Sequence, residues 1–303
     1  MSHQHSLLSR PAVLENLGRG VIIHPFNPGL LKSCSYDVRL GPNFYRIYGV
    51  GETGDYIANP YRSDAVERRY GNTILAPSVE ELRVFLWNLY KRLSWRASGV
   101  SIDRYEQKVL AELVGFQRYR LSQALMDFFN LVKHWKGDKS AATLFQKVNY
   151  LLEQLTGFRK EDQVILLRPG EMILGHTMEH IGGTKDPETG RCFTAEMKAR
   201  SSVGRHGIEV CRCAGWGDVG YIFIWTMEIN NTTGSSIILL VGTALAQMKF
   251  YEVDPVPDNM LYGSDVTRDH YQVALDLERN IATWHPGMLV PKPLKIWRPD
   301  KPE

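Results

Sequence analysis

The spacing of apolar residues changes twice along the chain, and this change restricts the possible folds most. Between Ser78 and Leu155 apolar residues recur at helical spacing, whereas before residue 50 and from about 160 to 255 they alternate as in strands. Turns rich in Gly, Pro and Asn separate the alternating runs. The sequence therefore predicts a mainly β protein, an antiparallel barrel or sandwich, with an inserted α-helical subdomain.

The helical stretch has the pattern of three helices. Ser78 and Glu81 have capping-box spacing at its start, and apolar stripes continue through 101–137 and 140–155. Such helices can bury a small core of their own. Three parts are therefore predicted: a discontinuous β core at 1–70 and 160–275, a helical insertion at 71–159, and a C-terminal tail at 276–303.

Three shorter segments complete this prediction. Residues 6–19 carry an apolar stripe followed by Gly18, which predicts a short helix. Residues 50–75 show no period and are expected to form a loop. The proline-rich residues 255–303 are expected to form a lid and then an extended tail.

Composition narrows the class of protein and its location. A net charge of +3 is too small to indicate nucleic-acid binding, and no apolar run approaches the roughly 20 residues that cross a bilayer. Four cysteines form no metal or redox motif, and Cys211 and Cys213 are expected to point to one face of a strand as buried thiols. We expect a cytoplasmic protein, in the host cytoplasm if viral, that binds neither nucleic acid nor membrane.

The segment His176–His180 has the spelling H-x-x-E-H, which binds zinc when it lies on a helix. Here it follows a Pro-Gly turn and an apolar run, so a strand is predicted. Residues four apart on a strand lie roughly 13 Å apart, too far to bind one ion. The zinc-deaminase signature is also absent. We therefore expect no zinc site.

The stretch from Arg200 to Asn231 combines polar, basic and acidic residues. Arg200, Ser201, Ser202 and Arg205 supply guanidinium and hydroxyl donors that suit phosphate oxygens. Glu228 lies in the apolar run IFIWTMEI, a predicted strand, where a carboxylate is costly unless paired or used. Burial among Trp225, Met227 and Ile229 would raise its pKa, which suits proton transfer near neutral pH. The alternative to a functional site is a surface turn followed by a strand that carries one acidic residue with its hydrogen bonds satisfied.

The spacing within this stretch resembles the core of the dCTP deaminase family, in the dUTPase-like superfamily. The matching positions are Arg200, Ser201, Ser202, Arg205, Gly207, Ala214, Asp218, Gly220, Glu228 and Asn231. SYDVRLG at 35–41, LLRPGEMILGHTMEHI at 166–181, VGTALAQMKF at 241–250 and YGSD with HYQ at 262–272 extend the resemblance. It covers residues 10–50 and 160–275 but not 70–160, and it implies a dUTPase-like distorted β-barrel (β-clip).

The resemblance also implies a reaction, the hydrolytic deamination of dCTP to dUTP and ammonia without a catalytic metal. Glu228 would take a proton from the water that attacks C4 of cytosine, and would deliver protons to N3 and to the leaving amine. Arg205 would hold the water or the oxygen of the base, or keep Glu228 ionised, and Ser201 belongs to the same catalytic group.

The resemblance also implies which residues would contact the substrate. Arg200, Ser201 and Ser202 would hold phosphates bridged by magnesium, Ala214 would lie near the base and Asp218 near the deoxyribose. The remaining candidates are Gln247, which could be purely structural, and Tyr262, His270 and Tyr271, which would close over the nucleotide. The family further implies a trimer or hexamer with active sites between subunits.

The chain departs from the family pattern near the base and at the lid. Gly215 and Trp216 replace a histidine and a cationic or polar neighbour, while His270 and Ala274 replace a lysine and a glutamine. Phosphate contacts are thereby weakened or relocated. Two other functions remain open: dUTP pyrophosphate hydrolysis, alone or after deamination, and nucleotide sensing without catalysis, with the helical insertion as output.

Overall fold

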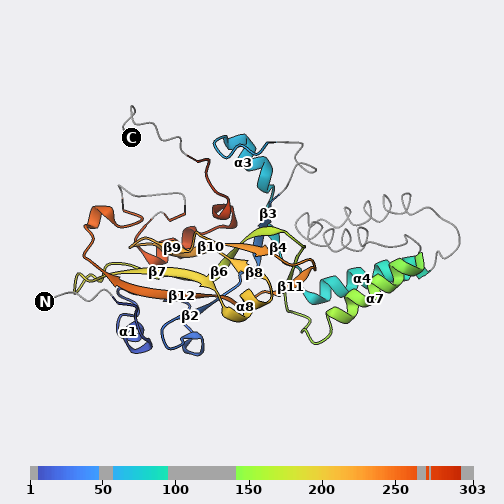
Figure 1. Cartoon of the computed structure of the whole chain (residues 1–303), viewed down its shortest axis with the longest axis horizontal. Coiled ribbons are helices and arrows are strands. Elements are labelled where there is room, and N and C mark those ends of the chain that lie inside the picture. Colours follow the sequence, from blue (N-terminus) through green and yellow to red (C-terminus); the bar gives the residue numbers. More distant parts are fainter. Residues whose placement is uncertain (1–5, 48–56, 95–140, 265–270, 273, 295–303) are drawn as a thin grey trace. The chain divides into compact units, whose positions relative to one another are not determined.

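The computed structural model describes residues 6–47, 57–94, 141–264, 271–272 and 274–294. The chain divides into two compact units (Figure 1). We call residues 1–73, 167–236 and 242–303 the β unit, and residues 74–166 and 237–241 the helical unit. Within the described part no helix is both long enough and apolar enough to cross a bilayer.

One antiparallel sheet of the β unit is built on a long central strand, β6. Strands β1, β3 and β10 each pair with β6, and β8 pairs with the far side of β10. Their bounds are β1 Val21–His24, β3 Asn43–Arg46, β6 Met172–Gly183, β8 Ile208–Val210 and β10 Ile222–Asn231. In the register Tyr45 of β3 and Glu228 of β10 both lie opposite Leu174 of β6. These three residues therefore form one row across the sheet.

The second sheet of the β unit has the strand order β2-β12-β7-β9 and is also antiparallel. Its bounds are β2 Tyr36–Arg39, β7 Cys192–Ala199, β9 Trp216–Gly217 and β12 Ala244–Val253. Large apolar side chains of both sheets, such as Phe193, Phe223 and Phe250, are almost completely buried. The prediction of a mainly β, antiparallel protein with an additional helical part is confirmed.

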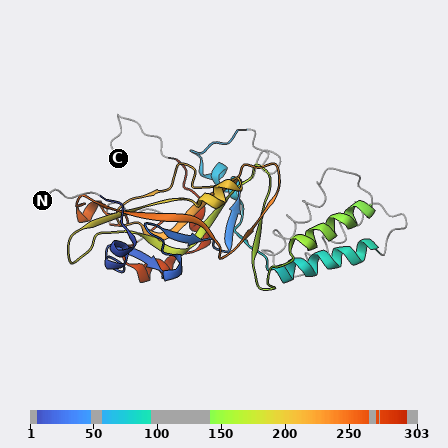
Figure 2. The ribbon, with the colours of Figure 1, turned by 60° about the horizontal axis from the view of Figure 1, so that its bottom comes forward.

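The helical unit buries an apolar core of its own. Helices α4, Val79–Ser94, and α7, Ala141–Gln154, lie side by side, and strands β5, Val164–Leu167, and β11, Ile237–Leu240, pair with each other (Figures 1 and 2). The capping box is confirmed, because Ser78 N–H donates to Glu81 at 2.9 Å and Glu81 N–H donates to the Ser78 hydroxyl at 3.2 Å. The predicted middle helix, 101–137, lies outside the described residues.

Besides the five-residue helix α8, Ser201–Arg205, two longer helices of the β unit occur where the sequence predicted none. Helix α3, Ser63–Tyr70, lies within the predicted loop, and its Val66 and Tyr70 pack against Tyr45 and Leu174. Helix α9, Leu277–Thr283, lies within the predicted C-terminal tail and is capped by the Asp276 side chain, which accepts from Arg279 N–H at 2.7 Å. The prediction failed because both helices are short and depend on packing against the sheet.

The remaining elements are short connections around these sheets and helices. The predicted N-terminal helix is present but shorter, since α1 covers only Arg10–Glu15. The others are η1 Pro28–Leu30, β4 Ile74–Leu75, α8 Ser201–Arg205, η2 Asp258–Met260 and η3 Pro286–Leu289.

Candidate active site

Glu228 lies near the middle of β10, on the face of the sheet that the row with Tyr45 and Leu174 occupies. Burial alternates along this part of β10, with Met227 and Ile229 fully buried and Glu228 half-buried. Side chains alternate along a strand, so Met227 and Ile229 point to the opposite face. The sequence placed Glu228 among these neighbours, and in this respect the prediction was wrong.

The carboxyl group of Glu228 is nevertheless removed from water. Its Oε2 atom is buried and has no hydrogen-bond partner among the described residues. Burial raises the pKa of Glu228 above its ordinary value, outweighing the opposite effects of its own backbone N–H and of the Cys211 thiol. The predicted direction of the shift is confirmed. A carboxylate with a raised pKa can both accept and return a proton near neutral pH.

The turn that follows β8 holds Cys211 against Glu228. Cys211 has a positive φ of 54°, and its N–H donates to the Glu228 carbonyl at 3.1 Å. Gly215 ends the turn, and a Cβ there would lie 2.0 Å from the Met197 carbonyl oxygen, so this position requires glycine. Because β8 ends before Cys211, the two cysteines do not share a strand. Cys211 is buried as predicted, whereas Cys213 is exposed.

The Arg-Ser-Ser turn forms the start of α8, at the end of β7. Ser201, Ser202 and Arg205 are exposed to solvent. Arg200 Nε lies 3.4 Å from the Asp37 carboxylate, and Gln247 Nε2 donates to the same carboxylate at 3.2 Å. The buried carboxylate of Asp37 therefore joins two of the predicted substrate-binding residues.

Other candidates come from the segments on either side of β8. Among the described contacts, no hydrogen bond or ion pair joins Glu228 to Arg205 or Ser201. Ala214 and Asp218 are exposed, and the Asp218 carbonyl accepts from Tyr221 N–H at 3.0 Å in a tight turn. The chain thus presents two candidate groups. One is the carboxylate of Glu228, and the other is the set of basic and hydroxyl side chains of α8.

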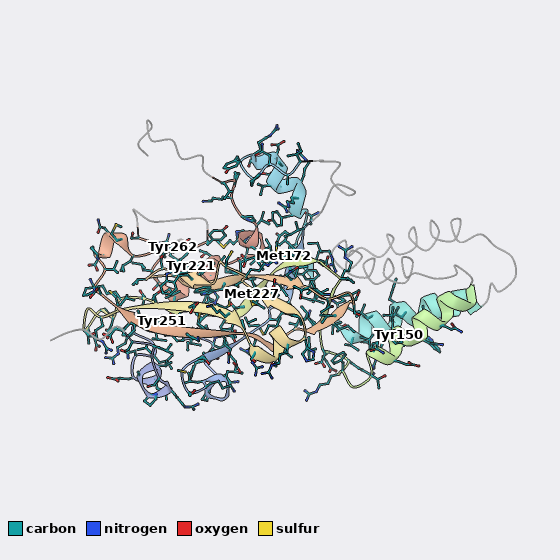
Figure 3. All side chains as sticks on the ribbon, in the orientation of Figure 1. Tyr150, Met172, Tyr221, Met227, Tyr251 and Tyr262 are labelled. Atoms are coloured by element: carbon teal, nitrogen blue, oxygen red, sulfur yellow. The ribbon has the colours of Figure 1, made fainter. Side chains whose placement is uncertain are left out.

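Two of the predicted lid residues lie at the start of β10. The Tyr262 ring contacts the Tyr221 ring edge-on at 5.0 Å (Figure 3). Tyr221 contacts Trp225 in the same way at 5.1 Å. Tyr271 is close enough to raise the pKa of Tyr221, after the larger effects of burial and of Tyr262. His270 lies outside the described residues.

Gln272 is a residue whose role the sequence did not reveal. Its fully buried side chain accepts from Ile222 N–H at 2.8 Å and donates to the Gly220 carbonyl at 2.7 Å. It thereby attaches the C-terminal segment to the first residue of β10. The motif HYQ contained this glutamine, but its signal was assigned to the two aromatic residues before it.

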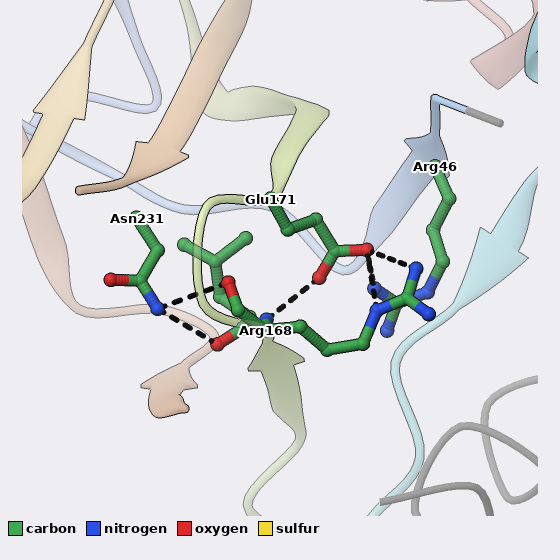
Figure 4. A network of polar contacts seen from close by, with 5 residues as sticks. Arg46, Arg168, Glu171 and Asn231 are labelled. Carbon is green, nitrogen blue, oxygen red and sulfur yellow. Dashed lines mark hydrogen bonds and ion pairs between the residues drawn. The ribbon is translucent and has the colours of Figure 1, made fainter. Parts of the chain in front are cut away.

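The turn between β5 and β6 carries a buried ionic network (Figure 4). Glu171 accepts hydrogen bonds from Arg46 and from the Arg168 side chain, the latter at 2.7 Å. The Asn231 side chain donates to the Leu167 and Arg168 carbonyls at 3.2 and 3.1 Å. Glu171 and Asn231, both matched to the family pattern, therefore fix the end of β10 to this turn.

The segment His176–His180 lies in β6, so the predicted strand is confirmed. Glu179 is fully buried and pairs with Arg39 at 2.6 Å. His176 Nε2 accepts from Asn43 N–H at 3.2 Å, while Nδ1 lies 2.8 Å from the Thr177 carbonyl. Among the described residues no group of three or more His, Cys, Asp or Glu side chains could hold a metal ion.

Acidification is expected to destabilise the β unit through His176. Burial lowers the pKa of His176 to about 4, so the folded state resists protonation that the unfolded chain accepts near 6.5. The contribution of His176 to the free energy of unfolding is on the order of 3 kcal/mol. It is complete above pH 6.5 and is lost as the pH falls to about 4. Denaturant unfolding between pH 7 and 4 measures it. The free energy of unfolding of His176→Gln should fall less between pH 7 and 4 than that of the native protein. The control His285→Gln, at an exposed site, should fall as much as the native protein does.

Fold and contacts together define a mainly β domain with one carboxylate of raised pKa and, separately, a basic, hydroxyl-rich turn. Residues 125–253 match the family model described as dCTP deaminase-like. The first residues of this match fall within the segment that the sequence assigned to the helical insertion. This part of the chain is therefore similar to dCTP deaminase-like domains.

Individual proteins with a related description are also similar to this chain. The chain is 35% identical over 111 residues to a "dCTP deaminase, dUMP-forming" of Bifidobacterium animalis subsp. lactis, covering 37% of this chain and 54% of that protein. It is 33% identical over 112 residues to the protein of the same description from Tropheryma whipplei, with coverages of 37% and 54%. The chain thus spans about half the length of these relatives.

Solved structures also show similarity. The 2'-deoxycytidine 5'-triphosphate deaminase from Agrobacterium tumefaciens has a TM-score of 0.42 and 13% identity, over 83% of this chain and 49% of that chain. The native EIAV dUTPase has a TM-score of 0.24 and 18% identity, over 32% of this chain and 79% of that chain.

Proposed function

We propose that this protein hydrolytically deaminates a deoxycytidine nucleotide, with Glu228 as the general base and acid. The observation that carries the proposal is the buried, unpartnered Oε2 of Glu228, at the position where the family pattern has its glutamate. A buried acceptor without a partner is costly unless it is used. The family match supports a deoxycytidine nucleotide as the substrate.

The proposed reaction needs one water and no redox partner. Glu228 takes a proton from water while the water oxygen bonds to C4 of the cytosine, and it passes this proton to N3. Glu228 then takes the proton of the C4 hydroxyl group and delivers it to the amino group. The C4–N bond breaks, ammonia leaves and C4 becomes a carbonyl, so dCTP and water give dUTP and ammonia. The raised pKa of Glu228 suits both transfers, because neither protonation state is strongly disfavoured near neutral pH.

Substrate binding is proposed for the polar groups around this centre. Arg200 and Ser202 would hold the phosphates together with Ser201, and magnesium would be held through the phosphates rather than by protein ligands. Arg200 is partly exposed beside Asp37, so its guanidinium can reach both the carboxylate and a bound anion. Ala214, Asp218, Gln247, Tyr262, His270 and Tyr271 remain proposed contacts to the rest of the nucleotide.

The absence of a described hydrogen bond or ion pair between Glu228 and the α8 residues favours an assembly. Arg205 makes no described contact with Glu228, and Ser201, Ser202 and Arg205 are exposed. We therefore propose a homotrimer or hexamer in which neighbouring subunits complete each site. Sedimentation of the purified protein tests this assembly.

A second candidate product is dUMP. The relatives named above are described as dUMP-forming, which adds release of pyrophosphate to the deamination. Incubation with dCTP and magnesium, followed by chromatography and an ammonia assay, tests both proposals. Ammonia with dUTP supports deamination alone, whereas ammonia with dUMP and pyrophosphate supports the combined reaction. The same incubation with dUTP shows whether the second step occurs separately. Absence of ammonia from every cytosine nucleotide would contradict the proposed deamination.

A further inference from the structure

The buried carboxylate of Asp37 is contacted by two cations from different parts of the β unit. Arg200 Nε lies 3.4 Å from Asp37 Oδ1, and Lys32 Nζ lies 3.5 Å from Oδ2. The Gln247 side chain also donates to Oδ1, at 3.2 Å. The Asp37 side chain is 3% exposed, whereas the side chains of Lys32 and Arg200 are 45% and 35% exposed. The acid is therefore enclosed, and both cations reach solvent.

The charges of this cluster do not balance. Among the described residues, Asp37 is the one carboxylate that pairs with Lys32 or with Arg200. Gln247 is neutral and adds only a donor. The three charged side chains together therefore carry one positive charge. Because two cations held on one carboxylate repel each other, an anion on their solvent side would reduce this repulsion.

The position of Lys32 is fixed by contacts within its own turn, before β2. Its N–H donates to the Ser35 carbonyl at 2.8 Å, and the preceding Leu31 is 1% exposed. Its ammonium group donates to the Gly29 carbonyl at 3.2 Å in addition to contacting Asp37. An ammonium group has three N–H donors, so one remains for a ligand oxygen. The side chain is held in place before a ligand binds, which lowers the entropy cost of binding.

Arg200 and the residues after it supply further donors. The described contacts of Arg200 use Nε for Asp37 and Nη1 for the Ala244 carbonyl, at 3.3 Å. Its Nη2 makes no hydrogen bond among the described residues. Ser201 and Ser202 follow directly in the chain and are exposed. Guanidinium, ammonium and hydroxyl groups together suit the oxygens of a polyphosphate.

We infer that Lys32 is a further phosphate-binding residue. The inference rests on the proposed deamination and extends its substrate site. Lys32 and Arg200 bind phosphate oxygens of a nucleoside triphosphate, while Asp37 holds both cations from the buried side. In the sequence Lys32 lies in a loop without a motif, and the contact of both cations with Asp37 reveals it.

Substitution of Lys32 tests this role with inorganic triphosphate as the probe, which binds without turnover. Lys32→Gln removes a charged donor, so the dissociation constant for triphosphate should rise about tenfold in calorimetry. The KM for dCTP should rise similarly with little change in kcat, whereas binding of deoxycytidine, which has no phosphate, should change less than about twofold. Lys32→Arg keeps the charge and should bind triphosphate within about threefold of the native protein.

The matched control is Lys198→Gln. Lys198 lies two residues before Arg200, but its ammonium group pairs with Glu196 at 2.8 Å, one cation to one carboxylate. Its loss should change the dissociation constant for triphosphate less than about twofold, because exposed charges are screened by salt. Equal weakening by Lys32→Gln and Lys198→Gln would reduce the effect to general charge and overturn the inference, as would unchanged binding by Lys32→Gln.

A measurement on the native protein needs no variant to fold. Triphosphate should slow the acetylation of Lys32 by acetic anhydride severalfold, read by mass spectrometry, and should leave that of Lys198 nearly unchanged. Acetylation of Lys32 at the same rate with and without triphosphate would overturn the inference. If Lys32 is protected but no cytosine nucleotide is deaminated, the phosphate contact stands and the proposed reaction fails. If deamination occurs without any dependence on Lys32, the reaction stands and the inference fails.

Discussion

Glu228→Gln is expected to reduce kcat for deamination by about 10³-fold, within the range measured for general acid–base residues. Glutamine has nearly the same shape but cannot take a proton from water or return one to the leaving amine. Nucleotide binding should change little, because the substitution removes no phosphate contact. Ammonia release measures kcat, and calorimetry with dCTP and magnesium measures the dissociation constant.

The control for this experiment is a carboxylate on the neighbouring strand. Glu209 of β8 is also half-buried, but its carboxylate pairs with Arg212 at 2.8 Å. Glu209→Gln should leave kcat within about twofold, since surface ion pairs contribute little. Turnover by Glu228→Gln close to that of the native protein would show that another group moves the protons. Loss of both nucleotide binding and turnover would assign Glu228 a role in positioning the nucleotide.

Sequence reasoning succeeded where one local pattern determines the outcome. The apolar run around Glu228 predicted a strand, and burial on a strand was enough to predict the direction of its pKa shift. The Pro-Gly turn before His176 indicated a strand rather than a zinc-binding helix, and β6 confirms this. Ser78 and Glu81 specified a helix start with both reciprocal hydrogen bonds. Each of these outcomes depends on fewer than ten consecutive residues.

The surroundings of Glu228 could not be predicted because they come from distant segments. Leu174, Tyr45 and Tyr70 reach it through strand register and through a helix that the sequence did not reveal. Neighbours in the sequence were taken as neighbours in space, although alternate residues on a strand point to opposite faces. The pairing of Arg200 with Asp37 likewise depends on which strand lies beside β12. Register between strands far apart in the chain is not encoded in a single segment.

Glu171→Gln is expected to lower the free energy of unfolding of the β unit by about 3–5 kcal/mol, because it removes the countercharge of a buried guanidinium. Arg46 is 1% exposed and contacts the same Glu171 oxygen as Arg168. Both cations lower the pKa of Glu171 against the effect of burial, so the ion pair stabilises the fold above the ordinary glutamate pKa and is lost as the pH falls. Denaturant unfolding at pH 7 measures the loss.

The matched control is Glu188→Gln. Glu188 pairs with Arg19 at 2.8 Å, but both side chains are largely exposed, at 69% and 40%. The pair is hydrated and screened by salt, so its loss should cost less than about 1 kcal/mol. Equal destabilisation by the two substitutions would show that burial of Arg46 does not determine the strength of the network. A large loss for Glu171→Gln alone would instead show that the buried ion pair between Arg46 and Glu171 helps to hold this turn at the end of β10.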